Sequence, residues 1–260
     1  NYVKSQLINE YAHKSNAVLD IGSGRGGDLF KYIQQNLVKN LIVVDKDKTC
    51  LSELFSRWLE LGKISHTVLR TSLRGIILDM NDPYNENIQK INSVTETTYF
   101  ESIFCHSALH YFCESIESIR NFVKFCNKCT RTGSKIIITC PNGEAIFNLL
   151  KNTNIWTAIE NDSVKYQINK EYTDNVLTEA GQKISVLLPF SKGKTYSEYL
   201  VNTNVLVQAF KDDRFTLLTK KNYSKYLEGF NIYKNHKYKL LTSIDKEWSE
   251  LYQSLVFKRN

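Results

Sequence analysis

The sequence predicts an α/β protein built around a mostly parallel sheet, and three observations lead to this prediction. Short apolar segments alternate with helical patterns through the first half of the chain, as in a doubly wound sheet. These apolar segments are continuous runs, which is typical of strands that helices cover on both faces. The chain has 260 residues, 42% of them hydrophobic, so it is long enough for one domain with a sizeable core.

Five apolar runs in the first half are predicted to be the parallel strands: Ala17–Ile21, Leu41–Val44, Gly75–Leu78, Ser102–Cys105 and Lys135–Thr139. Helices are predicted before and between them at Val3–Lys14, Gly26–Gln35, Thr49–Leu61 and Ile116–Cys129. The third of these helices has its apolar residues at helical spacing, at Leu51, Leu54, Phe55, Trp58 and Leu59. Pro141 ends the fifth strand because proline cannot donate a hydrogen bond to a sheet.

The pattern changes in the second half of the chain, from about Asn152. Residues 152–195 are polar and contain short strand-like segments such as Lys183–Leu188, so we expect an insertion or lid there. A helix is predicted over Thr195–Lys211. Strands are predicted at Arg214–Lys220 and Leu251–Phe257, and these two are expected to form an antiparallel hairpin at the sheet edge. We expect one domain over residues 1–260, with its core at about 1–150 and 196–260 and the insertion or lid at about 152–195.

Composition narrows the classes of function. The net charge of +7 favours an anionic partner, although ordinary solubility charge can be as large. No apolar run approaches the roughly 18 residues of a membrane helix, so no membrane partner is expected. Several of the six cysteines lie in apolar segments, which fits a reducing intracellular compartment better than a disulfide framework. Because the sequence starts at Asn1 without Met, we expect a piece of a longer protein.

The strongest local motif is the glycine-rich segment Val18–Asp28, between the first strand and its helix. Glycines there let the backbone turn sharply and approach a ligand at the carboxyl ends of the strands. Gly22, Gly24 and Gly27 satisfy the G-x-G-x-x-G spacing of dinucleotide-binding loops, so a nicotinamide cofactor remains an alternative. Asp20, two residues before the first glycine, favours a cationic cofactor such as S-adenosylmethionine, since a carboxylate would repel a diphosphate.

Two further acidic residues follow predicted strands. Asp45 ends the second strand, where a carboxylate can accept hydrogen bonds from both hydroxyls of an adenosine ribose. Asp79 follows the third strand and can meet the adenine amino group, although a turn or helix cap explains this residue alone almost as well.

Two pairs of potential metal ligands lack the partners that a metal site needs. His106 and His110 are four residues apart, but Ser107 stands where the zinc motif H-E-x-x-H has Glu, and no third ligand has motif spacing. Cys126 and Cys129 form a single C-x-x-C among Phe and Val residues, which indicates buried thiols. No metal site is therefore expected, and the polar and aromatic residues after the fourth strand are interpreted as a substrate site.

With these residues in view, the chain resembles the mRNA cap guanine-N7 methyltransferases, most closely those within the capping enzymes of large cytoplasmic DNA viruses such as African swine fever virus. The resemblance spans nearly the whole chain and depends on scattered segments: Asn1–Ser5, Leu19–Phe30, His110–Tyr111 with Glu114–Ser115, Pro141–Asn142 and Glu198–Val201. A generic methyltransferase would share only the glycine loop. The resemblance implies a Rossmann-like class I S-adenosylmethionine-dependent methyltransferase fold with S-adenosyl-L-methionine as its cofactor.

The glycine loop and the resemblance together assign residues to two ligands. Those assigned to the cofactor are Lys4, Asp20, Gly22, Gly24, Asp45, Asp79, His106 and Tyr111. At the position of His106, the family has Gln. Those assigned to the cap are His110, Tyr111, Pro141 and Glu198, with Arg25 and Arg57 at positions that contact its phosphates. Two positions depart from the family: Ser107 replaces an aromatic residue, and Ser254 replaces a Tyr unless Tyr252 takes that role.

The implied reaction transfers a methyl group to guanine N7 of GpppRNA and forms the m7G cap. N7 carries a free lone pair and no proton, so the reaction needs alignment of the reacting atoms and no general base, and no catalytic residue is expected. Glu198 can accept hydrogen bonds from guanine N1–H and the 2-amino group. A ribose 2′-O-methyltransferase and a catalytically inactive RNA-binding module of the same fold remain alternatives.

The expected partner is the 5′ end of capped RNA. The resemblance implies triphosphatase and guanylyltransferase domains linked upstream of Asn1, and a monomer is favoured. It also implies that the protein acts inside the host cell, in the cytoplasm at viral factories, and is present in the virion.

Overall fold

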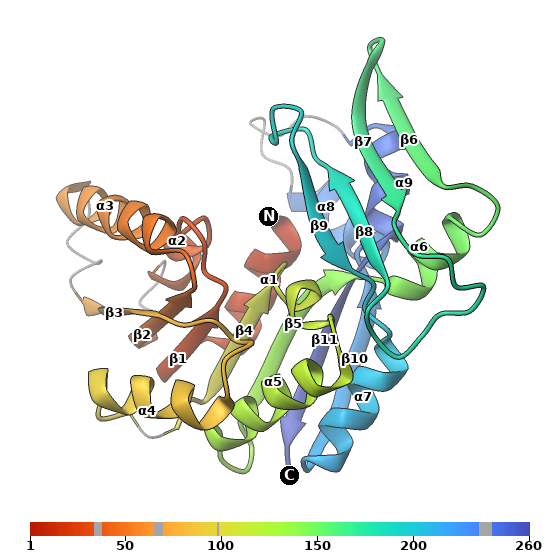
Figure 1. Cartoon of the computed structure of the whole chain (residues 1–260). Helices are drawn as coiled ribbons and strands as arrows, with labels where there is room; N and C mark the ends of the chain where they lie inside the picture. The colour runs from red at the N-terminus through yellow and green to blue at the C-terminus, as the bar shows by residue number, and fades with distance from the viewer. Residues whose placement is uncertain (34–37, 65–69, 98, 234–240) are drawn as a thin grey trace.

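The computed structural model describes residues 1–33, 38–64, 70–97, 99–233 and 241–260, and a seven-stranded sheet forms the centre of this part of the chain (Figure 1). The strand order is β10-β11-β5-β4-β1-β2-β3. These strands are β1 (Ser15–Ile21), β2 (Val38–Asp45), β3 (Ser72–Ile77), β4 (Ser102–His106), β5 (Lys135–Pro141), β10 (Phe215–Asn222) and β11 (Tyr252–Arg259). Strands β1 to β5 are parallel, and β11 runs antiparallel to both β5 and β10. The order reverses between β1 and β4, which is where open α/β sheets bind ligands.

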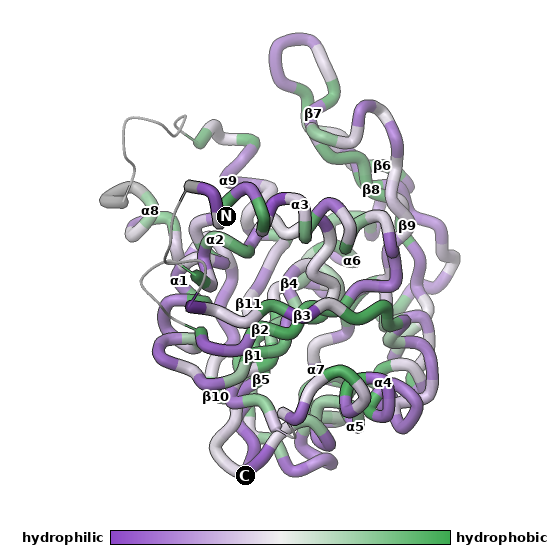
Figure 2. The backbone as a smooth tube through the Cα atoms, turned by 90° about the vertical axis from the view of Figure 1, so that its left-hand side faces the viewer, coloured by the Kyte–Doolittle hydropathy of each residue, from purple (hydrophilic) through white to green (hydrophobic). Residues whose placement is uncertain are grey.

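Helices cover both faces of this sheet because alternate strand residues point to opposite sides. In β1, Leu19 and Ile21 belong to the core under α4 (Tyr84–Val94), α5 (Ile116–Lys128) and α7 (Thr203–Asp212). Val18 belongs to the core under α1 (Tyr2–Tyr11), α2 (Leu29–Ile33) and α3 (Lys48–Ile64). Figure 2 shows the apolar strands between these two layers of helices. Burial on both faces explains why the strands appear in the sequence as continuous apolar runs.

Helix α5 illustrates how the sequence specifies one of the helices that pack on the α4, α5 and α7 face of the sheet. Ser115 caps it, since its side-chain oxygen accepts a hydrogen bond from the Ser118 N–H at 3.1 Å. Its buried residues include Ile119, Phe122, Val123 and Cys126, which fall at the spacing of one helical face. The thiol of Cys126 is therefore part of the core.

A second, antiparallel sheet of four strands has the order β6-β7-β8-β9. Its strands are β6 (Ile155–Glu160), β7 (Ser163–Lys170), β8 (Lys183–Leu187) and β9 (Thr195–Tyr199). It follows α6 (Gly143–Leu149) and lies above the upper ends of β4 and β5 in Figure 1, where β9 contacts the short helix η3 (Leu109–Phe112). Between β10 and β11 lie η4 (Tyr223–Tyr226), α8 (Leu227–Tyr233) and α9 (Ser243–Glu250). The second sheet and α9 thus stand over the carboxyl ends of the parallel strands.

All seven strands predicted for the main sheet are present, and the antiparallel pairing of the last two is confirmed. The helix predicted over Thr195–Lys211 is wrong at its start, because Thr195–Tyr199 forms β9 beside β8. That helix, α7, begins only after Asn202, whose side chain caps it by accepting from the N–H groups of Asn204 and Val205.

Two predicted helices are shorter than expected, and several elements were not predicted. The first helix ends at Tyr11, and Lys14 adopts a φ of 56°. The helix predicted over Gly26–Gln35 begins at Leu29, because Gly26 has a φ of 74° and belongs to the loop; residues 34 and 35 lie outside the described ranges. Besides β9, the elements for which no range was predicted are α4, α6, α8, α9, η3, η4, β6 and β7.

No helix among the described residues is long and apolar enough to cross a membrane. All six cysteines are free thiols, and five of them are buried.

Candidate active site

Two cavities open at the carboxyl ends of the parallel strands. The first cavity, of about 270 Å³, is lined by the glycine loop after β1, the end of β2, the segment after β3 and the start of η3. The second cavity, of about 570 Å³, lies between η3, the β8–β9 turn, α9 and the start of β11. Ser107 and Tyr111 line both cavities. A ligand in one cavity therefore lies beside a ligand in the other.

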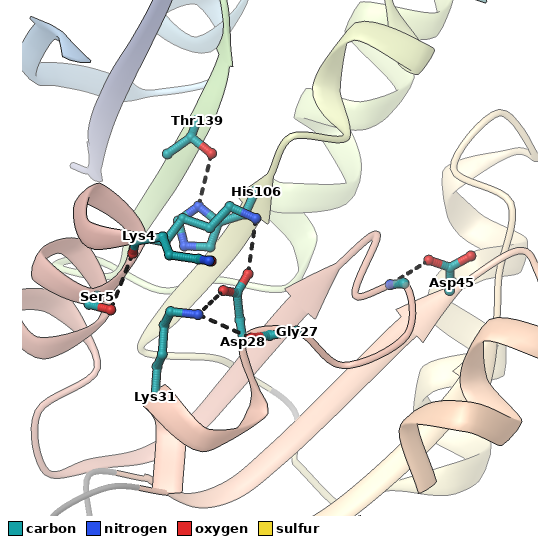
Figure 3. Close-up of polar contacts among 10 residues, drawn as sticks. Lys4, Ser5, Gly27, Asp28, Lys31, Asp45, His106 and Thr139 are labelled. Atoms are coloured by element: carbon teal, nitrogen blue, oxygen red, sulfur yellow. Dashed lines mark hydrogen bonds and ion pairs between the residues drawn. The ribbon is translucent and has the colours of Figure 1, made fainter. Parts of the chain in front are cut away.

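The glycine loop closes one wall of the first cavity and fixes the position of Asp45. The Gly24 N–H donates to Oδ2 of Asp45 at 2.8 Å (Figure 3), and the Asp47 N–H donates to Oδ1 at 3.0 Å. Gly22 has a φ of 69°, and a Cβ atom there would lie 2.4 Å from the Cβ of Ala108. Only glycine allows this approach of the loop to the start of η3. Gly22, Gly24, Asp45 and Asp79, all predicted cofactor residues, line this cavity together.

A partly buried charge cluster lies next to the loop, centred on Asp28. Its carboxylate accepts from Lys31 Nζ at 2.6 Å and from Lys4 Nζ at 3.2 Å, and Figure 3 shows both lysines directed at it. Burial is the largest single effect on Asp28 and opposes its charge, but the charges of Lys4 and Lys31 and the hydrogen bond from Lys31 act together with His106 against it, and the pKa of this carboxyl group is lowered to about 2. Asp28 was not among the predicted site residues, although it ends the glycine-rich motif.

Asp20 lies beside this cluster and is 5% exposed. Desolvation by burial, followed by repulsion from Asp28, raises its pKa to about 8, against an opposing effect of Lys4. Asp20 is not among the residues that line either cavity.

His106 packs next to the same cluster at the end of β4. Its Nδ1 lies 3.2 Å from Oγ1 of Thr139, and its buried Nε2 has no partner among the described residues (Figure 3). Burial, followed by the charge of Lys4, lowers its pKa to about 3, so the ring is neutral. Of this group only Lys4 reaches a cavity wall, that of the second cavity.

The second cavity contains a buried histidine and glutamate that face each other without a hydrogen bond. His110 is 3% exposed and Glu198 is 4% exposed, and His110 Nε2 lies 3.6 Å from Glu198 Oε1. Burial lowers the pKa of His110 to about 3 and raises that of Glu198 to about 7, so the two do not form an ion pair at neutral pH. Both ring nitrogens of His110 and Oε2 of Glu198 have no partner among the described residues. Buried polar atoms are almost always paired, so these three atoms are suited to hydrogen bonds with a polar ligand.

Aromatic side chains form the walls around this pair. The ring of Tyr111 lies 4.2 Å from that of His110. Trp248 of α9 and Tyr252 of β11 line the opposite side, with their ring centres 5.4 Å apart. Trp248 stacks on Tyr166 of β7 at 4.3 Å. Trp248 was not predicted, because nothing in the sequence near it marks a site.

Contacts between α9 and the second sheet hold Trp248 in place. Asp245, one turn before Trp248, accepts from Lys165 Nζ at 2.7 Å and from the Tyr166 hydroxyl at 3.0 Å. It also completes a capping box with Thr242 at the start of α9. The second sheet is thus tied to the wall of the second cavity.

Three predicted cap-binding residues, Pro141, Arg25 and Arg57, lie away from the cavity walls. Pro141 is buried at the end of β5 and lines neither cavity. Arg25 is exposed and forms an ion pair with Glu53 at 3.2 Å, and Arg57 is exposed on α3. Of the two candidates near the last strand, Tyr252 lines the second cavity.

The departures from the family pattern have clear places in the structure. Ser254 is fully buried and hydrogen-bonded to the hydroxyl of Tyr226 at 2.9 Å. Ser107, with a φ of 57°, stands where the two cavities meet. Within the described ranges, no group of three or more His, Cys, Asp or Glu side chains could hold a metal ion.

Solved structures similar to this chain are S-adenosylmethionine-dependent methyltransferases. One from Clostridium acetobutylicum ATCC 824 covers 100% of this chain and 92% of its own, with a TM-score of 0.61 and 15% identity. The CcbJ methyltransferase from Streptomyces caelestis covers 99% and 94%, with a TM-score of 0.63 and 11% identity. The predicted methyltransferase fold is confirmed.

Relatives in sequence are capping proteins. The mRNA-capping enzyme of African swine fever virus (strain Badajoz 1971 Vero-adapted) is 32% identical over 272 residues, covering 100% of this chain and 30% of its own length. The probable mRNA-capping enzyme of Acanthamoeba polyphaga mimivirus is 27% identical over 260 residues, covering 91% and 22%. The mRNA cap guanine-N(7) methyltransferase of Caenorhabditis briggsae is 28% identical over 159 residues, covering 58% and 40%. The chain spans under a third of the length of the two viral relatives.

Residues 1–255 match the family described as the mRNA (guanine-N(7))-methyltransferase domain. The match covers both cavities, from Lys4 and the glycine loop to Tyr252. This chain therefore belongs to the mRNA (guanine-N7)-methyltransferase domain family.

Proposed function

We propose that this chain methylates N7 of the cap guanine of GpppRNA with S-adenosyl-L-methionine as methyl donor. The observation that carries the proposal is the unpaired His110–Glu198 pair, buried in a cavity that meets the cofactor cavity at Ser107 and Tyr111. Guanine presents adjacent N1–H and 2-amino donors, which complement a carboxylate in that position.

The residues of the first cavity fit the cofactor. Asp45 is oriented by two backbone N–H groups and keeps lone pairs for the ribose hydroxyls, and Asp79 is available to the adenine amino group. Gly22 and Gly24 let the backbone approach the ligand, and nothing lies within 4 Å of a Cβ atom built on Gly24. The cofactor supplies an electrophilic methyl group on a sulfonium.

The charge cluster fits the methionine end of the cofactor. Asp28 carries the negative charge that attracts a cationic ammonium, and Asp20 offers oxygen atoms that can accept its hydrogen bonds, while Lys4 and Lys31 favour the carboxylate. His106 stands beside the cluster as a neutral ring with a free Nε2.

The guanine is proposed to enter the second cavity with its donor edge on Glu198. His110 meets the base or its ribose, and Tyr111 and Tyr252 pack on it. Pro141 supports this wall from β5, where it pairs with Tyr252. Arg25 and Arg57 are proposed to contact the triphosphate, which for Arg25 requires release from Glu53.

The chain's contribution to the reaction is alignment. N7 has no proton to lose, so the residues hold the base against the methyl group and exclude water, and none acts as a general base. A ribose 2′-O-methyltransferase must activate a hydroxyl. Lys4, which lines the second cavity, is held in an ion pair by Asp28, which disfavours that alternative.

The wider setting is also a proposal. The match covers only 30% and 22% of the two viral relatives, so we propose linked triphosphatase and guanylyltransferase domains. We also propose that the chain acts in the host cytoplasm and as a monomer. The residues that precede the chain in the full protein would carry these activities.

The test is to incubate the protein with labelled S-adenosylmethionine and GpppRNA, digest the RNA and locate the label. We expect all label in m7G. Label in a 2′-O-methyl nucleoside would instead select the ribose methyltransferase, and no label on any RNA would support an inactive binding module.

A further inference from the structure

The rim of the second cavity carries an aromatic side chain that the fold leaves in water. Phe190 is 74% exposed, the highest value among the exposed large hydrophobic residues of the described ranges, yet it lines the cavity. Because the ring of Phe190 is in contact with water, the fold does not gain the favourable free energy that burial of a phenyl ring provides. The exposed ring therefore needs an explanation outside the packing of this chain.

Phe190 lies on a hydrogen-bonded turn between β8 and β9. The Ser191 N–H donates to the Leu188 oxygen at 2.9 Å, and the Lys194 N–H donates to the Ser191 oxygen at 3.1 Å. Ser191 is 5% exposed, so the turn is anchored there. Lys192 and Gly193 adopt φ values of 52° and 80°, which reverse the chain tightly. The turn thus presents Phe190 outward from a defined backbone.

Two lysines accompany the ring on the same turn. Lys192 and Lys194 are exposed, and neither forms an ion pair with an acidic side chain of the described residues. An aromatic face beside unpaired cations is the combination with which proteins bind single-stranded RNA: bases stack on the ring and phosphates meet the cations.

The position of the turn indicates which part of a substrate it meets. Glu198 is buried deep in the second cavity, and Tyr196, on the same face of β9, is 39% exposed and lines the cavity between Glu198 and the turn. A substrate whose guanine reaches Glu198 must extend outward past Tyr196. This path leads toward the turn, since Phe190 and Tyr196 line the same cavity as Glu198.

We propose that Phe190, Lys192 and Lys194 form a subsite for the first transcribed nucleotide of the capped RNA. The ring of Phe190 stacks on its base, and the two lysines neutralise the adjoining phosphates. This inference rests on the proposed function, because it takes capped RNA as the substrate.

The test compares two guanine substrates, GpppRNA and GTP, of which only the first has a nucleotide after the triphosphate. We expect Phe190→Ala to raise the KM for GpppRNA by about fivefold or more, in line with the contribution of a base–aromatic stack, and to leave the KM for GTP unchanged. Phe190→Trp should keep the wild-type KM for both. The matched control is Tyr99→Ala, an exposed aromatic residue on a different pocket.

The lysines are tested by salt dependence. For single strands each lost phosphate contact flattens the slope of log K against log salt by about 0.7, so Lys192→Glu with Lys194→Glu should flatten it by up to about 1.4 for GpppRNA. Lys128→Glu, an exposed lysine on α5, should leave the slope unchanged.

Two results would overturn the subsite. Equal losses on GTP and GpppRNA would mean that Phe190 covers the cap guanine, and an unchanged KM for GpppRNA would mean that the ring meets no base. Failure of the proposed function is seen separately, as no methylation of either substrate by the wild-type protein. In that case the anisotropy of fluorescent GpppRNA titrated with the same variants still decides whether the turn binds RNA.

Discussion

At the scale of single residues, the fold without cofactor disfavours ionisation of the Asp20 carboxyl group. Burial and then Asp28 raise its pKa to about 8, from 3.8 in an unfolded chain. The folded state therefore favours the protonated form. The contribution of Asp20 to stability is present below about pH 4 and is lost as the pH rises through 8.

Asp20→Asn should consequently raise the melting temperature of the cofactor-free protein at pH 8, and the gain should shrink toward pH 4. The same variant should bind S-adenosylmethionine roughly 10- to 100-fold more weakly, because a charge-assisted attraction is lost. Melting curves across this pH range and titration calorimetry measure the two effects. Asp82→Asn, at a surface carboxylate paired with Lys90, serves as the control. Unchanged cofactor affinity would remove Asp20 from the site.

Glu198 should make guanine binding depend on pH. Its pKa is raised to about 7 by burial, and only the carboxylate form accepts both guanine donors, so the affinity for a cap analogue should rise with pH through about 7 and then level off. His110, with a pKa of about 3, stays neutral over this range. In Glu198→Gln the pH dependence should vanish along with most of the cap methylation, while cofactor binding persists. A cap affinity that is flat from pH 6 to 8 in the wild type would contradict this role.

At the scale of elements, the glycine loop depends on its close approach to η3. Gly22→Ala would place a Cβ atom 2.4 Å from the Cβ of Ala108, in addition to the cost of its φ of 69°. Gly24→Ala is the matched control, since its φ is 53° and nothing lies within 4 Å of the added atom. We expect Gly24→Ala to cost about 1 kcal/mol of unfolding free energy and Gly22→Ala clearly more, measured by urea denaturation without cofactor. Equal losses would mean that the loop can move away from η3.

The second sheet and α9 should act as one support for the wall of the second cavity. Asp245→Ala leaves Lys165, Tyr166 and Thr242 without their shared acceptor and should destabilise the protein by about 1–3 kcal/mol. Because Trp248 is then held less firmly, the KM for capped RNA should rise while the Kd for S-adenosylmethionine does not change. Glu160→Gln, which removes only the other partner of Lys165, should show neither effect on the cap. A parallel rise of both constants in Asp245→Ala would indicate general unfolding instead.

At the scale of the whole molecule, the inner strands β1, β2, β4 and β5 could be predicted because they are buried on both faces over most of their length and are therefore mostly apolar. The positions of strands β6 and β7 could not be predicted, because these strands are half exposed. On β6, Ile155 and Ile159 face water. On β7, Lys165 forms an ion pair with Asp245, and the Tyr166 hydroxyl donates a hydrogen bond to it. Their sequence carries neither a continuous run nor a clean alternation.

The residues of the candidate active site also fall into those that could be predicted from the sequence and those that could not. Gly22, Gly24 and Asp45 could be predicted because the chemistry lies in adjacent residues at the ends of strands. Trp248 could not, since its place depends on contacts between segments such as Tyr166 and Asp245, 79 residues apart in sequence. The ion pairs of Asp28 with Lys4 likewise form only in the folded chain. The roles assigned to Pro141, Arg25 and Arg57 stay predictions.

The measurement that tests the central claim most directly replaces a single atom of the substrate. RNA capped with 7-deazaguanosine keeps the N1–H and 2-amino donors that face Glu198 but has a C–H in place of N7. We expect this RNA to compete with GpppRNA at a similar inhibition constant and to accept no methyl group, while GpppRNA is methylated. Methyl transfer to the 7-deaza cap RNA at the rate of GpppRNA would contradict N7 as the acceptor.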